Sequence, residues 1–139
     1  MSDKPPSRDT SVATLELISP GLIELRYKPT ATFDPHGFAE ISRAGSTLWR
    51  EGPYSVMAVI PAEVQVDPLA TDHDHLQHTR AHGRLEALAL VTDSEAMHMA
   101  AKVYFIYHQQ PFPVQVFSEE YDALKWLRAR PYELGMAAG

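Results

Sequence analysis

Apolar and polar positions alternate along the first part of the chain in the pattern of β-strands. Two alternating stretches between residues 13 and 28 flank a Ser-Pro-Gly turn at residues 19–21, which predicts an antiparallel hairpin. In the second stretch Ile23, Leu25 and Tyr27 share one face and charged residues occupy the other. This strand is therefore expected to be half-buried.

Signals for helices and strands alternate through the rest of the chain. Asp34 and Pro35 are a typical helix start, and apolar residues then recur at helical spacing until Gly52. The remaining elements are predicted in the order strand, short helix, strand, helix, strand and helix, over residues 54–64, 73–83, 85–91, 95–108, 112–117 and from residue 118 onward.

The resulting order, ββαβαβαβα, predicts a single α/β domain. Alternating strands and helices favour right-handed crossovers and a mainly parallel sheet, in which the hairpin supplies an antiparallel edge. Two interior strands are apolar on both faces, so we expect helices on both sides of the sheet. Within the 139 residues we expect a domain over residues 13–131, a flexible tail over residues 1–12 and a frayed tail over residues 132–139.

Composition excludes several classes of protein and site. The 12 basic and 18 acidic residues give a net charge of −6 without a basic cluster, which argues against a nucleic-acid partner. The absence of cysteine excludes disulfides, thiolate nucleophiles and zinc fingers. The polar N-terminus lacks the apolar region of a signal peptide, and no apolar run approaches the ~20 residues of a spanning helix. We therefore expect a cytoplasmic protein.

The most conspicuous cluster of chemical groups is the histidine-rich segment at residues 71–82. On a helix His75, His78 and His82 share an arc of about 60°, but the first and last lie ~10.5 Å apart along the axis. Zinc–nitrogen bonds are only about 2.0–2.1 Å long, so at best one pair of these histidines binds a metal. Thr79 also replaces the glutamate of the H-E-x-x-H motif. The pattern favours a solvated helix face over a metal site, and we expect no cofactor.

Catalytic serine motifs are also missing. Ser46 lacks the G-x-S-x-G elbow, and no glycine-rich phosphate loop is present. Ser94 is better explained as a helix cap than as a nucleophile. The sequence therefore favours a protein without enzymatic activity.

The predicted helix over residues 95–108 is apolar around most of its circumference. Met99 and Ile106 extend the expected core stripe on one side and Phe105 extends it on the other; the stripe itself comprises Ala96, Met97, Ala100, Val103, Tyr104 and Tyr107. Such a helix is either wedged between the sheet and a neighbouring helix, or it presents Met99, Phe105 and Ile106 as a contact surface or the wall of an apolar pocket.

The stretch "ALALVTDSEAMHMAAKVYFIYHQQPFPVQVFSEEYDALKWL", residues 87–127, orders a strand, an Asp-Ser cap, an apolar helix, a strand and a closing helix. In this order the chain resembles the STAS superfamily, in particular its SpoIIAA-like group of small bacterial proteins, over roughly residues 15–130. The resemblance implies the STAS fold and a non-enzymatic module without catalytic residues.

The resemblance also implies a mode of action. STAS domains of the anti-sigma-factor antagonist type bind a partner kinase or sigma-regulating protein and are switched by phosphorylation of a serine in a D-S-S-G-like pattern. Asp67 matches the aspartate, but Pro68 and Leu69 stand where the serine and its neighbour belong, and Thr71 is out of register. We therefore expect no phosphoserine switch. SpoIIAA-like relatives are also similar in structure to lipid-carrying CRAL-TRIO domains.

These observations lead to one main functional hypothesis and two alternatives. The main hypothesis is a regulatory module that contacts another protein, or a second copy as a homodimer, through the apolar helix or the loop that contains Asp67, Thr71 and Asp72. The first alternative is a carrier of a small apolar or lipid-like ligand. The second is a metal-dependent enzyme that uses the histidines at 75, 78 and 82.

Overall fold

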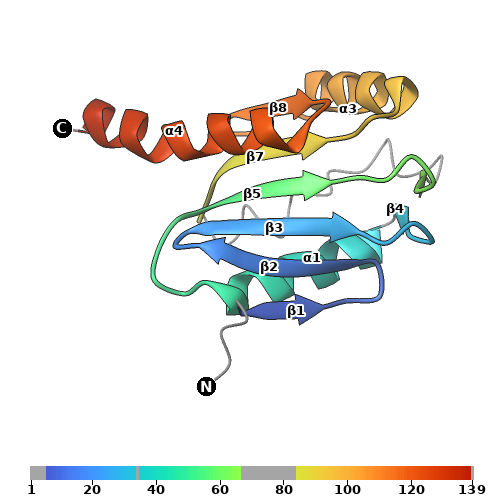
Figure 1. Ribbon diagram of the computed structural model, residues 1–139, viewed down its shortest axis with the longest axis horizontal. Helices are drawn as coiled ribbons and strands as arrows, with labels where there is room; N and C mark the ends of the chain where they lie inside the picture. Colours follow the sequence, from blue (N-terminus) through green and yellow to red (C-terminus); the bar gives the residue numbers. More distant parts are fainter. Residues whose placement is uncertain (1–5, 34, 67–83, 139) are drawn as a thin grey trace.

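The computed structural model describes residues 6–33, 35–66 and 84–138, which contain one six-stranded mixed sheet (Figure 1). Its spatial order is β1-β2-β3-β5-β7-β8. These strands are Ser7–Asp9, Ala13–Ser19, Leu22–Tyr27, Tyr54–Val59, Leu85–Val91 and Val114–Phe117. Two shorter strands, β4 (Thr32–Phe33) and β6 (Gln65–Val66), pair with each other in parallel outside this sheet.

The predicted hairpin is confirmed as the antiparallel pair β2–β3. Leu15 lies opposite Leu25, and the pairing shifts register next to the turn, where Ser19 lies opposite Leu22. Gly21 has a φ of 72°, a conformation that glycine adopts without steric cost. The Gly21 carbonyl oxygen accepts a hydrogen bond from the Ser55 N–H at 2.8 Å, so the turn is also joined to β5.

The rest of the sheet is parallel, as predicted from the alternation of strands and helices. Leu25, Ala58, Leu90 and Val116 occupy successive paired positions and form a row across β3, β5, β7 and β8. The four side chains all belong to one hydrophobic cluster or pack against it. A single row of apolar residues therefore joins the edge hairpin to the last strand.

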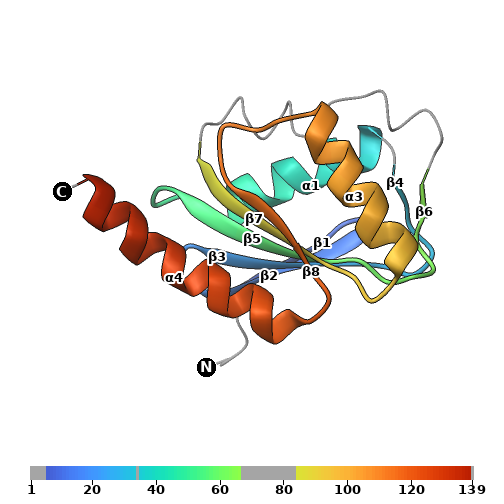
Figure 2. The same ribbon diagram turned by 90° about the horizontal axis from the view of Figure 1, so that it is seen from above.

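Helices cover both faces of the sheet (Figure 2). On one face, α1 (Pro35–Leu48) contacts β1 and β2, and α3 (Glu95–Tyr107) contacts β8. On the other face α4 (Glu120–Ala138) crosses β5, β7 and β8. Ala123 and Leu127 of α4 are buried there against Met57. The prediction of helices on both sides is thus confirmed. No helix in the described part of the chain has the length and apolarity needed to traverse a bilayer.

The N-terminal end differs from the prediction. Residues 1–12 were expected to form a tail, but Ser7–Asp9 form β1, which pairs antiparallel with β2 and places Arg8 opposite Leu15. All three side chains of β1 are exposed, so the strand has no apolar pattern to reveal it. It forms because backbone groups at the edge of β2 accept a partner, and because Thr10 exchanges side-chain hydrogen bonds with the backbone of Ala13.

The C-terminal end also continues further than predicted. The domain was expected to end at residue 131, but α4 extends to Ala138. The apolar periodicity fades near that point, and the extension contains Pro131 and Gly135, which are poor helix formers, so the sequence alone does not predict it.

Candidate functional site

The start of α3 is built by hydroxyl side chains at the end of β7. Ser94 is the N-cap residue, and its Oγ accepts a hydrogen bond from the Met97 N–H at 3.2 Å. Thr92 Oγ1 accepts from the Ser94 N–H at 3.2 Å, and the Thr92 N–H donates to the Phe117 carbonyl oxygen at 3.0 Å. The predicted capping role of Ser94 is confirmed, and the helix start is tied to the ends of β7 and β8.

One row of side chains holds α3 on the sheet. Met97, Ala101 and Phe105 follow each other at four-residue spacing and pack against the core that α3 shares with α1. None of the α3 residues is fully buried. Phe105, predicted as a contact residue, therefore lies with the core-facing row and not with Met99 and Ile106.

The opposite side of α3 carries an exposed apolar surface, which we call the α3 stripe: Met99, Val103, Ile106 and Tyr107. Their exposed fractions are 61%, 43%, 67% and 79%. Among the described residues five large apolar side chains are exposed to this degree, and only Tyr121 lies outside α3. Surface helices are normally polar on the side that faces solvent. The helix thus has apolar residues on both sides, and one side faces solvent.

The prediction of which residues of α3 face the core was wrong. Val103 and Tyr107 were expected in the core but are exposed, whereas Ala101 and Phe105, expected at its margin, face the sheet. A helix that is apolar around most of its circumference has no single apolar arc, so the pattern alone does not define the buried face.

Charged groups border the α3 stripe on one flank. At 100° per residue Glu95 and Lys102 lie next to Met99 and Ile106, and both charged residues are exposed. On the other flank Tyr104 is half-buried and its ring stacks on His108, with 4.5 Å between ring centroids. The stripe is therefore bounded by charge on one side and by an aromatic pair on the other.

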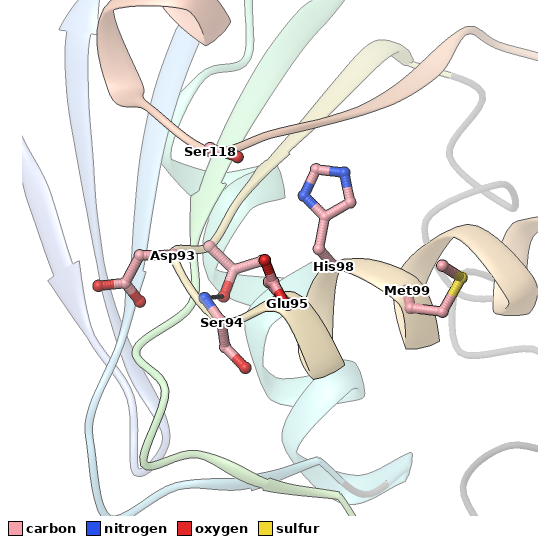
Figure 3. A pocket seen from close by; sticks show the side chains of 7 residues that line it. Asp93, Ser94, Glu95, His98, Met99 and Ser118 are labelled. Atoms are coloured by element: carbon pink, nitrogen blue, oxygen red, sulfur yellow. Dashed lines mark hydrogen bonds between the residues drawn. The ribbon is translucent and has the colours of Figure 1, made fainter.

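A hollow of about 340 Å³ lies where the N-terminal end of α3 meets the ends of β7 and β8 (Figure 3). It is lined by Thr92, Asp93, Ser94, Glu95, His98, Met99 and Ser118. Asp93 and Met99 lie at opposite ends of it in this view, and His98 lies between them. Two of its hydroxyl groups, those of Thr92 and Ser94, already accept the hydrogen bonds that cap the helix. Six of the seven lining residues carry polar groups, but most of the exposed lining surface is apolar, and Met99 joins it to the α3 stripe.

Metal binding finds no support in this part of the molecule. Within residues 6–33, 35–66 and 84–138, histidines and carboxylates form no group of three or more that could hold an ion. The metal candidates His75, His78 and His82 lie outside the described residues, as do the loop candidates Asp67, Thr71 and Asp72. Their roles, and the helix expected over residues 73–83, stay predictions.

Comparison with known proteins first defines the class of fold. The structure is similar to the crystal structure of an uncharacterised protein of the DUF3478 family with a SpoIIAA-like fold from Shewanella loihica PV-4, with a TM-score of 0.51 and 16% identity. The match covers 91% of this chain and 98% of that chain. This confirms the SpoIIAA-like fold expected from the sequence, and at this identity it shows the fold alone.

The family follows from a match of sequence. The family model described as a domain of unknown function, DUF7793, matches residues 17–130, and the chain belongs to this family. A comparison with curated proteins found no match. The matched range nearly coincides with the range over which the sequence resembles the SpoIIAA-like group.

Proposed function

We propose that this protein is a non-enzymatic, STAS-like module of the cytoplasm that regulates or assembles with another protein by contact through the α3 stripe. The observation that carries the proposal is the concentration of exposed apolar side chains on the outward side of one helix. Extended apolar area on a small domain usually marks an interaction site. Full burial of a Met, Ile or Val side chain contributes about 1.5–3 kcal/mol, so a partner that covers the stripe gains substantial free energy.

The geometry of α3 supports this function in a second way. Met97, Ala101 and Phe105 anchor the helix to the sheet, and Ser94 caps its start, so the outward side chains are held on a fixed support. A preformed surface loses less conformational freedom on binding than a flexible segment does. The stripe is therefore suited to a partner that docks on a helix already in place.

The hollow beside α3 does not distinguish the carrier alternative from a contact module, because six of its seven lining residues carry polar groups while most of its exposed surface is apolar. Pro68 and Leu69 replace the phosphorylated serine and its neighbour of the anti-sigma-factor antagonists, so the proposed module acts without that switch. In the proposed module the partner is recognised by contact with α3 and not through a phosphorylated serine.

The proposal is tested by a photo-crosslinking amino acid placed at Met99 or Ile106 in the full-length protein inside its native cell. Crosslinks to one protein of defined mass from positions 99 and 106, but not from position 125, are the expected result. Lys125 is the control because it is exposed on α4, on the opposite face of the sheet. Equal crosslinking from all three positions, or none from α3, would overturn the proposal.

A stability measurement accompanies the crosslinking. Met99→Glu with Ile106→Glu is expected to abolish the crosslink and to change the free energy of unfolding by less than about 1 kcal/mol, as exposed positions do. Met97→Glu, on the core-facing row, is expected to cost about 2 kcal/mol or more because it brings a carboxylate to the core. If the double variant unfolds instead, Met99 and Ile106 are core residues and the stripe is not a contact surface.

A further inference from the structure

The outward side of α3 has the residue spacing of a coiled-coil seam. Ala96, Met99, Val103 and Ile106 are exposed and follow each other at intervals of three, four and three residues. This is the spacing of the a and d positions of two heptads, which face a second helix when one is bound. We call these four residues the heptad seam. Its geometry suits a helical partner rather than an extended one.

The positions beside the heptad seam differ between its two flanks. Glu95 and Lys102 each directly precede an a position, so they occupy the g positions, where partner choice is set by charge. The corresponding e positions hold Ala100 and Tyr107, which carry no charge. A helix bound along the seam therefore meets one carboxylate and one ammonium group, seven residues apart on the same flank.

A second copy of the chain does not match this arrangement when its α3 is antiparallel. The antiparallel register that covers the whole seam sets Met99 against Val103 of a second copy and brings the two Lys102 side chains together. Sliding the copies by one heptad pairs Glu95 with Lys102 of the second copy but leaves Val103 and Ile106 without a counterpart on the helix. Apolar contact and charge pairing therefore need different registers.

Parallel self-pairing does not satisfy the charges either. In a parallel pair the g position of one helix faces the following e position of the other. Glu95 would then face Ala100, and Lys102 would face Tyr107. No pair of opposite charges forms in either orientation that covers the seam.

The size of the seam also disfavours a stable dimer of two domains. The 13 residues of α3 span about 20 Å at 1.5 Å per residue. Stable interfaces between globular proteins bury about 800 Å² on each partner, which is more than one helix face of this length offers.

Resting on the proposed function, we propose that the heptad seam binds an amphipathic helix of another protein in antiparallel orientation. That helix carries a carboxylate beside Lys102 and, seven residues later along its own chain, a basic residue beside Glu95. In this orientation the apolar contacts of Met99, Val103 and Ile106 and both charge pairs form in a single register.

The test uses the full-length protein and two monomeric 21-residue peptides that are held helical by a crosslink on their outer face. Both peptides have leucine at the a and d positions; the first has Glu and then Lys at its g positions, and the second has them reversed. The first peptide is expected to bind about fivefold more tightly at low salt, measured by fluorescence anisotropy, because both charge pairs change sign between the peptides. The variant Glu95→Lys with Lys102→Glu is expected to invert this preference, and the control Lys125→Glu is expected to leave it unchanged.

The outcomes separate this inference from the proposed function. Equal affinity for the two peptides, or a preference that the double variant does not invert, would overturn the charge-matched helix while leaving the α3 stripe as a contact surface. Binding of neither peptide, when crosslinks from positions 99 and 106 do form, would show that the partner is not such a helix. A dimer in sedimentation that is lost on Met99→Glu would identify a second copy as the occupant and would also overturn the inference.

Discussion

The guanidinium group of Arg84 lies at the end of α1 and donates a hydrogen bond from Nη1 to the Trp49 carbonyl oxygen at 2.6 Å. Its Nη2 donates to the Ser46 carbonyl oxygen at 3.0 Å. The last carbonyl groups of a helix lack partners within the helix, and the last turn of α1 contains no basic residue of its own. A residue at the entrance to β7 therefore caps a helix that ends 36 positions earlier in the chain.

Loss of this cap is expected to destabilise the protein. Arg84→Met keeps the apolar stem but removes both hydrogen bonds and the cation–π contact with Tyr54, whose ring centroid lies 5.6 Å from the guanidinium carbon. We expect a loss of about 1–3 kcal/mol in the free energy of unfolding, measured by urea denaturation, since charged hydrogen bonds of this kind contribute about that much. Arg128→Met, at an exposed position of α4, is the matched control and is expected to change little. Equal effects of the two substitutions would contradict a capping role.

The N-cap of α3 makes a separate prediction. Ser94→Ala removes the acceptor of the Met97 N–H and is expected to cost about 1 kcal/mol, whereas Ser94→Asp keeps an acceptor and is expected to be close to neutral. Amide hydrogen exchange is the appropriate measurement, because the alanine variant is expected to lose protection in the first turn of α3 while the strands of the sheet keep theirs. Uniform loss of protection across the protein would argue against a local capping effect.

The second core, beneath α4, is expected to depend strongly on one leucine. Leu127 is 1% exposed and packs in the cluster around Met57 and Ala89. Leu127→Ala is expected to cost about 2–5 kcal/mol from lost burial and the cavity left behind. Leu124→Ala, one turn earlier and only partly buried, is expected to cost less. If both substitutions cost the same in denaturant unfolding, α4 packs on the sheet differently from this description.

Alkaline pH is expected to unfold the protein through two buried phenols. Burial raises the pKa of Tyr27 above its ordinary value of 10.0, and burial also raises the pKa of Tyr54, where the nearby Arg84 opposes the shift. A raised pKa in the folded state means that the stabilisation is complete below pH 10, the ordinary value, and is lost as the pH rises beyond it. Circular dichroism between pH 8 and pH 12 should therefore show a transition that moves to higher pH in Tyr27→Phe. If the substitution leaves the transition unchanged, ionisation of Tyr27 is not what unfolds the protein at alkaline pH.

Native mass spectrometry of the protein as purified, without added metal or lipid, distinguishes the three functional hypotheses. A mass equal to that of the chain alone is expected for a contact module. Additional mass that dissociates as an organic molecule would favour the carrier alternative. Additional mass equal to a zinc or iron ion would favour the histidines at 75, 78 and 82, and their substitution by alanine would then have to remove it.

The elements that could be predicted from the sequence are those whose signals are local. The Ser-Pro-Gly turn at residues 19–21 defines the hairpin, and Ser94 marks the start of α3 within one turn of the helix. β1 could not be predicted because its side chains are exposed and only pairing with β2 orders it. The short pair β4 and β6 is likewise made by two segments distant in the chain.

At the candidate site, too, the sequence predicted what depends on neighbouring residues and missed what depends on contacts with distant elements. The apolar surplus of α3 was visible in the sequence, and two of the three contact residues named from it, Met99 and Ile106, are exposed. Which face of the helix meets the sheet was not visible, because Met97, Ala101 and Phe105 are no more apolar than Val103 and its neighbours. Only the position of β8 beneath the helix decides between them.

The strand order β1-β2-β3-β5-β7-β8 has a consequence for how the chain is made. Every strand of the large sheet joins the edge left by an earlier strand, so the sheet can grow in one direction while the polypeptide leaves the ribosome. The face formed by Met57, Ala89 and Val91 gains its cover only when α4, the final element, is released. During synthesis that face of the sheet therefore stays uncovered after all six strands have been released.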